Sequence, residues 1–569
     1  MDNLRDLILA AKERRCQLLI RNARVVNVFT REILQTDVGL AGGLVLGLGG
    51  EWTARRELDA EGAYLTPGLI DGHLHIESSM AHPARLARAV LAQGTTALIA
   101  DPHEIANVAG KAGLSYMLQA TEGLPLRVWF MLPSCVPCTE FETSGATLCA
   151  SDLAGFKEQP RVLGLAEAMD YVAVTTAAPQ MLAKLELFRD RPIDGHAPLL
   201  SGPALEAYCL AGPASDHECS RYEEVVEKLR AGMHIHLRYG SACRGVEEIL
   251  ARIAAEKLPT ERMLFCTDDK HLENIRAEGH INFILARAVA NGLDPLEAVA
   301  MATINAARCY GLRRYGAVAP GYAADLVLFE DLKDFRVRRV IVDGQPLEEA
   351  VWPALRQPQP QEAEARVYHS VRLAPRTPDS LRLPARPDMP VIRLRPGEIL
   401  TQLVRREVPQ RHGCFVAGEG LLKLAVLERH QATGRVGLGV LEGLPLKNGA
   451  IAATVGHDSH NLIVAGDNDR DMLRAIDALE QAGGGYAVVG GGELLALLEL
   501  PVAGLMSEAP LEEILRKQRE LLAAAAGLGA DLSRSDPFIT LSFLALPVIP
   551  EARLTDKGMF QVNTMSFIS

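Results

Sequence analysis

From Tyr64 onward the sequence repeats one pattern, in which an apolar run of strand length is followed by polar residues and then by a helical stretch. Eight runs are predicted to be strands: residues 64–70, 95–100, 127–132, 161–165, 192–194, 213–215, 233–237 and 262–266. Helices are predicted between them, for example over 83–92, 221–230 and 246–255. Eight strand–helix units within about 250 residues are typical of a (β/α)8 TIM barrel, whose active site lies at the carboxyl ends of the strands. The fifth and sixth runs are short and are assigned as strands partly because the count requires them.

A chain of 569 residues is too long for one ordinary core. Short β-type runs at 16–20 and 23–29 precede the barrel, and runs at 326–329 and 337–342 follow it, which predicts a small β-sandwich domain built from both flanks. A C-terminal α+β domain is predicted from a helical run at 469–482 and a strand at 486–489. The expected bounds are 1–62 and 316–352 for the two parts of the β-sandwich, 63–315 for the barrel, 353–397 for a proline-rich linker, and 398–569 for the C-terminal domain.

Charge and composition narrow the class of protein. The chain has 59 basic and 71 acidic residues, a net charge of −12, which argues against nucleic acid as a partner because phosphate binding needs a basic surface. No apolar run reaches membrane-spanning length, and residues 1–15 do not resemble a signal peptide. The ten cysteines are scattered, as is typical of a reducing compartment. We therefore expect a cytoplasmic protein with a small-molecule substrate and no membrane partner.

Histidines and carboxylates follow several of the predicted strands, where a barrel would bring them together. His73 and His75 are separated by one residue, so on a strand they share a face and can bind one cation. The other candidate ligands at strand ends are Glu167, His196, His217 and Asp268. We expect two divalent ions, one held by His73, His75 and Asp268, the other by His196 and His217, with Glu167 as the bridge. Each residue alone could instead be a helix cap or a loop residue, but chance placement of the whole set is far less expected.

Other polar residues near the strand ends are candidates for catalysis and substrate binding. Asp268 would be placed to take a proton from the attacking water, with Glu167 as the second catalytic carboxylate. His103 and Glu104 could touch the substrate or carry the second proton, or they could have a structural loop role. Candidate substrate-binding residues are His103, Glu104, Glu77 and Arg238. His457 and His460, in the C-terminal domain, could line the active-site mouth, bind an ion or make structural hydrogen bonds.

The run from Pro67 to His75, Pro-Gly-Leu-Ile-Asp-Gly-His-Leu-His, resembles the first metal motif of the amidohydrolase superfamily. The continuation Ile76-Glu-Ser-Ser-Met80 resembles the bacterial and archaeal adenine deaminase family within it. The resemblance continues through further motifs to the end of the chain, including those that begin at Asp101, Asp194, Ser215, Thr267 and His457. It implies hydrolysis of adenine to hypoxanthine and ammonia at a centre of manganese or iron, with zinc also compatible with the ligands. It also implies a carboxylate bridge at Glu167, where many relatives have a carbamylated lysine, and it favours a homodimer.

One departure from the family pattern concerns the end of the seventh strand. The family has Arg-Glu-Gly-Ser there, whereas this chain has Arg238-Tyr239-Gly240-Ser241. Because that position is expected near the barrel mouth, two alternatives stay open. The chain could deaminate a related amino-purine or another amino-heterocycle, or it could be a catalytically silent paralogue that serves as a binding scaffold.

Overall fold

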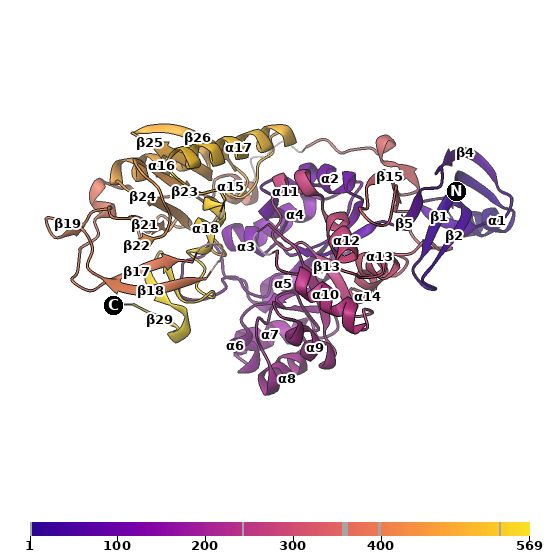
Figure 1. Ribbon diagram of the computed structural model, residues 1–569, viewed down its shortest axis with the longest axis horizontal. Helices are drawn as coiled ribbons and strands as arrows, with labels where there is room; N and C mark the ends of the chain where they lie inside the picture. The colour runs from indigo at the N-terminus through magenta and orange to yellow at the C-terminus, as the bar shows by residue number, and fades with distance from the viewer. Residues whose placement is uncertain (1–2, 242–243, 356–361, 396–399, 534–535, 569) are drawn as a thin grey trace.

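The computed structural model describes residues 3–241, 244–355, 362–395, 400–533 and 536–568. Figure 1 shows three parts in a row, with a barrel in the middle, a β domain at one end and a C-terminal domain at the other. Among the described residues, no helix combines the length and the apolar character needed to cross a membrane.

The middle part is a ring of eight parallel strands. They are β6 (Leu69–Leu74), β7 (Thr95–Ala100), β8 (Arg127–Leu132), β9 (Val162–Ala168), β10 (Ile193–Gly195), β11 (Ser215–Asp216), β12 (His234–Arg238) and β13 (Met263–Cys266). The first five pair in order, as do the last three. One junction is a hydrogen bond from Ala214 N to Ile193 O (2.9 Å), and the other joins Asp268 N to His73 O (3.0 Å). The predicted barrel is confirmed, including its short fifth and sixth strands.

Helices surround the ring and cover the outer faces of its strands. They are α2 (Pro83–Ala92), α3 (His103–Ala109), α4 (Lys111–Ala120), α5 (Ala150–Lys157), α6 (Tyr171–Thr175), α7 (Pro179–Leu187), α8 (Gly202–Ala211), α9 (Tyr222–Arg230), α10 (Glu247–Glu256), α11 (Leu272–Glu278), α12 (Ile281–Ala290), α13 (Pro295–Ala300) and α14 (Ala306–Cys309), with a π-helical turn at Met301–Asn305. On α10 the side chains of Ile249, Leu250 and Ile253 are buried, as helical spacing of apolar residues predicts. Because both faces of the strands are covered, β6 and β7 are buried along their whole length.

The two flanks of the barrel pair into one sheet of eight strands, preceded by α1 (Leu4–Lys12). Its strands are β1 (Arg15–Asn27), β2 (Glu32–Ala41), β3 (Leu44–Leu48), β4 (Thr53–Asp59), β5 (Tyr64–Pro67), β14 (Leu326–Phe329), β15 (Val337–Val342) and β16 (Gln345–Pro346). The two strands predicted at 16–20 and 23–29 are one strand, β1, whose register shifts between Ile20 and Ala23. The prediction of two separate strands was therefore wrong.

The first predicted barrel strand, 64–70, is divided between two sheets. Its first half is β5, which pairs with β1 and β14, and its second half opens β6. Gly68 lies at the division, where its N–H donates to Asp325 O at 2.7 Å. A Cβ at this position would lie 2.0 Å from Thr96 Oγ1, so only glycine allows the chain to pass from one sheet to the other here.

The C-terminal domain is an eight-stranded sheet with helices on both faces. Its strands, in spatial order, are β18 (Thr401–Arg406), β17 (Met389–Leu394), β22 (Val436–Glu442), β21 (Leu421–Leu427), β24 (Leu462–Gly466), β23 (Gly449–Ala453), β25 (Gly485–Gly490) and β26 (Glu493–Glu499). Alternate residues of β23 enter different cores: Ala450 and Ala452 pack with α16 (Asp469–Ala482), while Ile451 packs with α17 (Leu511–Gly527) and α18 (Pro537–Phe543). The second core also contains Met80 and Leu272 of the barrel, so this face of the sheet joins the two domains.

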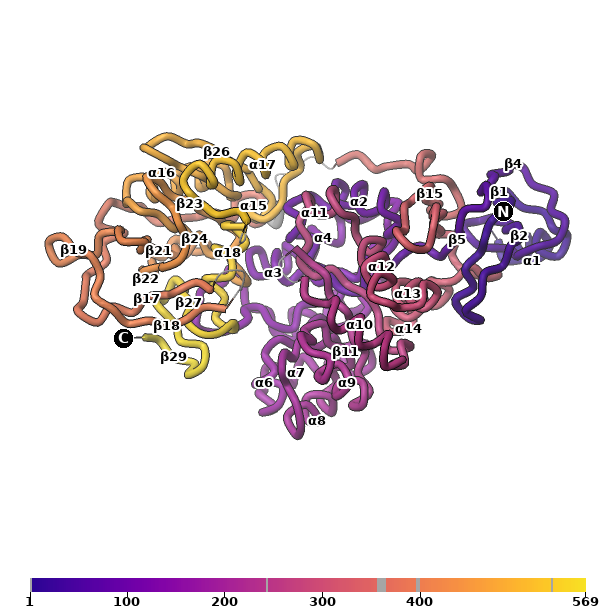
Figure 2. Tube along the Cα trace, viewed as in Figure 1, coloured from indigo at the N-terminus to yellow at the C-terminus, as the bar shows by residue number. Residues whose placement is uncertain are grey.

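Smaller elements complete the domain. They are the pair β19 (Gln410–Arg411) and β20 (Cys414–Phe415), and the three-stranded sheet of β27 (Ala552–Thr555), β28 (Gly558–Gln561) and β29 (Ser566–Phe567). Within 353–397, the described residues include α15 (Glu362–Tyr368), which packs against α3 and α4 (Figure 2). The same segment contains β17, which pairs with β18 and β22 and so extends the C-terminal sheet into the predicted linker.

Candidate metal centre and active site

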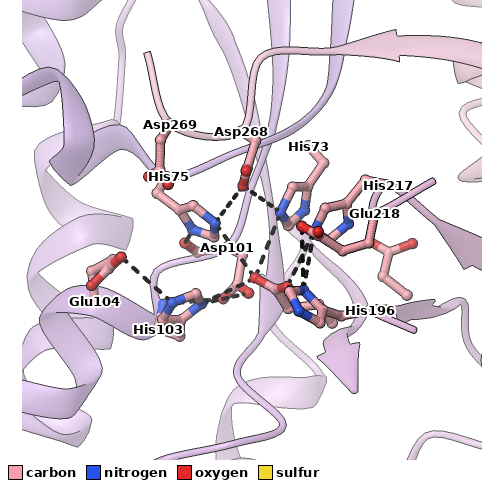
Figure 3. Close-up of polar contacts among 12 residues, drawn as sticks. His73, His75, Asp101, His103, Glu104, His196, His217, Glu218, Asp268 and Asp269 are labelled. Atoms are coloured by element: carbon pink, nitrogen blue, oxygen red, sulfur yellow. Dashed lines mark hydrogen bonds and ion pairs between the residues drawn. The ribbon is translucent and has the colours of Figure 1, made fainter. Parts of the chain in front are cut away.

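The six predicted metal ligands meet at the carboxyl ends of the barrel strands (Figure 3). Glu167, near the end of β9, lies at their centre. Its Oε1 is 3.4 Å from His75 Nε2 and 3.7 Å from His73 Nε2. Its Oε2 is 2.7 Å from His196 Nδ1 and 3.2 Å from His217 Nε2. One carboxylate therefore presents an oxygen to each pair of histidines, which is the arrangement expected of a bridging ligand.

Asp268 follows β13 and lies on the side of the His73 and His75 pair. Its Oδ1 is 3.0 Å from His75 Nε2 and 3.5 Å from His73 Nε2. Its Oδ2 accepts a hydrogen bond from Arg238 Nη1 at 2.6 Å. Burial raises the pKa of Asp268, but Arg238 and the two histidines outweigh burial and hold the pKa well below its usual range. The side chain is therefore an ionised carboxylate, as a proton acceptor must be.

The donor set fits divalent cations. His75 Nδ1 lies 3.0 Å from the carbonyl oxygen of Asp101, which can only accept, so Nδ1 carries a proton and Nε2 is the nitrogen that faces Glu167 and Asp268. A histidine that binds a metal through Nε2 has its Nδ1–H held by a carbonyl in this way. His73 Nε2 is buried and has no hydrogen-bond partner among the described residues. An unpartnered imidazole nitrogen beside carboxylates costs stability unless a cation lies between them.

His103 and Glu104, at the start of α3, lie beside this centre. His103 Nδ1 is 2.9 Å from Asp101 Oδ2 and 3.5 Å from Glu167 Oε1. Burial lowers the pKa of His103, but the Asp101 and Glu104 carboxylates outweigh burial and raise the pKa well above its ordinary value. A protonated imidazole is therefore held within reach of the ligand cluster.

Glu104 connects the barrel to the C-terminal domain. It accepts hydrogen bonds from His457 Nδ1, at 2.8 Å, and from His460 Nε2. Burial raises the pKa of Glu104, but the two histidines outweigh burial and hold the pKa well below its usual range. His457 and His460 therefore both contact the side chain of Glu104, and their roles at the active-site mouth or toward an ion stay predictions.

Comparison with known proteins agrees with this geometry. Residues 64–347 match the model of the amidohydrolase family, and residues 398–566 match that of the adenine deaminase C-terminal domain. An adenine deaminase of Nitratidesulfovibrio vulgaris (strain DP4) is 49% identical over 574 residues, covering 99% of this chain and 98% of its own. Adenine deaminases of Desulfatibacillum aliphaticivorans and Geobacillus kaustophilus are each 44% identical, covering 97% and 99% of this chain and 97% and 98% of their own.

The chain belongs to the adenine deaminase family.

The recognition made from the sequence motifs is confirmed, and so is the fold that the amidohydrolase model implies. Among solved structures, one described as a crystal structure of an adenine deaminase is 15% identical, covers 58% of this chain and 99% of its own, and has a TM-score of 0.45.

Two other predicted substrate-binding residues have protein partners in this family member. Glu77 is buried at the barrel mouth, where its Oε1 accepts from Ile105 N at 3.1 Å and burial raises its pKa to about 7. Arg238, at the end of β12, binds Asp268 and also donates from Nη2 to Glu218 at 3.0 Å.

The position that departs from the family pattern is Tyr239. It is 6% exposed, and its ring packs edge-on against Phe283 of α12 with centroids 5.2 Å apart. The position follows β12 at the carboxyl end of the barrel, as expected, but its side chain packs against α12 while that of the preceding Arg238 faces Asp268.

Sequence reasoning did not assign roles to three carboxylates at the site. Asp101 binds His103 with its side chain and His75 with its carbonyl oxygen, and Glu218 binds Arg238. Asp269 places a carboxylate oxygen within 4.8 Å of the ligand atoms of His75 and Asp268. All three follow predicted strands, so their positions alone marked them as candidates.

Proposed function

We propose that this chain hydrolyses adenine to hypoxanthine and ammonia at a two-ion metal centre. The observation that carries the proposal is the division of the Glu167 carboxylate between two histidine pairs, in a chain that belongs to the adenine deaminase family. In the net reaction a bond forms between C6 of the purine and a water oxygen, and the bond from C6 to the exocyclic nitrogen breaks. One water proton must be removed, and the departing nitrogen must be protonated to leave as ammonia.

The residues divide into two ligand groups. His73, His75 and Asp268 would hold one ion, His196 and His217 would hold the other, and Glu167 would contribute one oxygen to each. Bound there, a divalent ion lowers the pKa of water toward neutrality. We expect manganese or ferrous iron; zinc suits the same nitrogen and oxygen ligands.

The chain's own groups account for both proton transfers. Asp268 is ionised and tied to Arg238 through Oδ2, and it is assigned as the base that accepts the water proton. His103 is assigned as the group that protonates the leaving nitrogen, because it is positively charged and lies beside Glu167. Glu104, with which His103 Nε2 is in contact at 3.6 Å, holds it in place.

The alternatives from the sequence have less support. Tyr239 packs against α12, so its replacement of the usual carboxylate gives no reason to expect a different amino-heterocycle. A silent scaffold would have no need of five further ligands placed around the Glu167 carboxylate. The proposal also includes the finer expectations of a homodimer, which light scattering would test, and of a cytoplasmic location, which cell fractionation would test.

The test of the proposed function is a substrate panel. Protein loaded with manganese is incubated with adenine, guanine, 2-aminopurine and cytosine, and ammonia and the deaminated base are both quantified. We expect equal amounts of ammonia and hypoxanthine from adenine and much slower turnover of the other bases. Faster turnover of another base would favour the amino-heterocycle alternative, and no turnover of any base would favour the scaffold.

A further inference from the structure

A pocket lies at the interface between the barrel mouth and the C-terminal domain. From the barrel it is lined by residues that include Glu77 and Asp269, and from the C-terminal domain by residues that include His457, Tyr486 and Phe543. Of the residues named, the two nearest in the sequence are Asp269 and His457, which are 188 positions apart, yet the two walls meet at one site. Nothing in the sequence motifs assigned a role to Tyr486 or Phe543.

The pocket lies next to the metal centre, because two of its lining residues also approach the site. Asp269 lines it and also approaches the ligand atoms of His75 and Asp268 within 4.8 Å. His457 lines it and donates to Glu104, which in turn contacts His103. A ring bound in this pocket would therefore lie beside the metal centre.

The C-terminal wall has the chemistry to hold a flat heteroaromatic ring. The rings of His457 and Phe543 are stacked, with centroids 4.8 Å apart and planes inclined by 24°. Tyr486, which is 4% exposed, also lines the pocket, and its phenol group can both donate and accept a hydrogen bond. A purine in the pocket would offer ring nitrogens that accept and a ring N–H that donates, so the phenol can bond it in either direction.

The loop that carries His457 is held by hydrogen bonds from a buried arginine. Arg429 is 0% exposed and donates to Ala503 O at 3.0 Å, to Thr454 O at 3.4 Å and to the carbonyl oxygen of His460. The next residue, His430, bonds through Nε2 to Ser459 O at 2.7 Å. Because the backbone on both sides of His457 is held, the wall is preorganised rather than formed on binding.

We propose that the C-terminal domain supplies one wall of the purine-binding site. In this arrangement the stacked rings of His457 and Phe543 border the purine, the Tyr486 hydroxyl bonds a ring nitrogen or ring N–H, and His457 also positions Glu104. This inference rests on the proposed function, since it takes the bound ring to be adenine or hypoxanthine. It explains why a barrel that already holds every metal ligand is joined to a second domain through Glu104.

The test uses full-length, metal-loaded protein and three variants. Tyr486→Phe removes one hydroxyl, and we expect KM for adenine and Kd for hypoxanthine to rise by about 3- to 10-fold, the usual range for one hydrogen bond, with kcat little changed. Phe543→Leu should weaken hypoxanthine binding by about 2- to 10-fold, as expected for the loss of an aromatic contact. His457→Gln should lower kcat/KM by about 10- to 100-fold, as is typical when a positioning partner is lost. Metal content should be unchanged in all three.

The matched controls are Tyr322→Phe, in a residue that contacts Phe29 of the β domain, and His412→Gln, in an exposed residue between β19 and β20. If Tyr486→Phe and Phe543→Leu bind hypoxanthine with Kd values within about twofold of these controls, the proposed wall is wrong. The Tyr486→Phe variant tests the proposed wall even if the His457→Gln variant fails to fold. A wild-type protein that neither binds hypoxanthine nor releases ammonia from adenine would overturn the proposed function together with the wall, whereas an active wild type with unaffected variants would overturn the wall alone.

Discussion

Arg238 donates a hydrogen bond from Nη1 to Oδ2 of Asp268 over 2.6 Å, while Oδ1 of the same carboxylate faces His75 Nε2 at 3.0 Å. The two oxygens of Asp268 thus have different partners, one a fixed cation and the other the metal-ligand cluster. Arg238 also binds Glu218, so the guanidinium is held on two sides. Arg238 therefore acts on the proposed base, in addition to any contact it makes with substrate.

Replacing Arg238 by lysine keeps the positive charge but removes the planar guanidinium, the fork whose two nitrogens bind the carboxylates of Asp268 and Glu218. We expect kcat to fall by about 10- to 100-fold, because Asp268 loses its fixed orientation, while the metal content stays at the wild-type level. The measurement is steady-state deamination of adenine together with metal analysis. Arg252→Lys, at a surface ion pair 38% exposed, is the control. An Arg238→Lys enzyme with wild-type kcat would show that the fork does not position Asp268.

Glu167 is predicted to be the ligand shared by two ions. Glu167→Gln removes the charge that both histidine pairs face, so we expect fewer than two ions per chain and no deamination of adenine. Elemental analysis after dialysis counts the ions, and Glu419→Gln, in an exposed residue, is the control. Chelation of the wild type should abolish activity, and added manganese or ferrous iron should restore it. A variant that retains two tightly bound ions would contradict the bridging role.

Tyr239 is predicted to have a packing role. Its ring contacts Phe283, and Lys270 Nζ lies 5.6 Å from the ring centroid. Tyr239→Phe keeps the ring, so we expect kcat/KM for adenine and the order of preference among purines to stay within about twofold of the wild type. Tyr239→Ala should instead lower the melting temperature, because it leaves a cavity in the helix layer. A change of preferred base in Tyr239→Phe would restore Tyr239 as a specificity residue.

His82 is predicted to make the fold sensitive to acid. The ring caps α2 by accepting from Ala84 N at 3.1 Å, and burial, followed by Arg85, lowers its pKa to about 4. In the unfolded chain the pKa is near 6.5, so between pH 6.5 and 4 the unfolded state binds the proton and the folded state does not. The contribution of His82 to stability therefore falls as the pH drops through this range.

His82→Asn replaces the capping nitrogen with a capping oxygen, which cannot titrate. We expect the melting temperature of the wild type to fall more steeply than that of His82→Asn between pH 6.5 and 4, with parallel curves above pH 7. Thermal unfolding followed by fluorescence at a series of pH values measures this difference. Parallel curves over the whole range would show that the folded ring titrates normally.

Much of the barrel could be predicted from the sequence because its strands are continuous apolar runs that end in polar residues. The bounds of β7 and β8 match the predicted runs, and α2 and α16 begin and end where expected. The local sequence pattern did not predict the junction near Gly68, where one apolar run contributes a strand to each of two sheets. The cause is a tertiary contact with Thr96, which no local periodicity reveals.

The candidate site was predictable to the extent that strand ends meet in a barrel. His73, His75, Glu167 and Asp268 are brought together as that rule requires. The partners of Glu104 were not predictable, because His457 and His460 come from another domain and no spacing rule connects them to α3. The direction of the Tyr239 side chain was not predictable either, because it depends on the contact with Phe283 of α12.

The most direct test of the account measures ammonia and hypoxanthine released from adenine by metal-loaded wild-type, Asp268→Asn and Asp388→Asn proteins. Asp388, whose side chain is 69% exposed, is the control. We expect the wild type and Asp388→Asn to release both products in equal amounts at equal rates, and Asp268→Asn to be slower by about 10²- to 10⁴-fold, as for loss of a general base. Asp268→Asn with its metals bound and a rate within a few-fold of the wild type, or a wild type that releases no ammonia, would contradict the account.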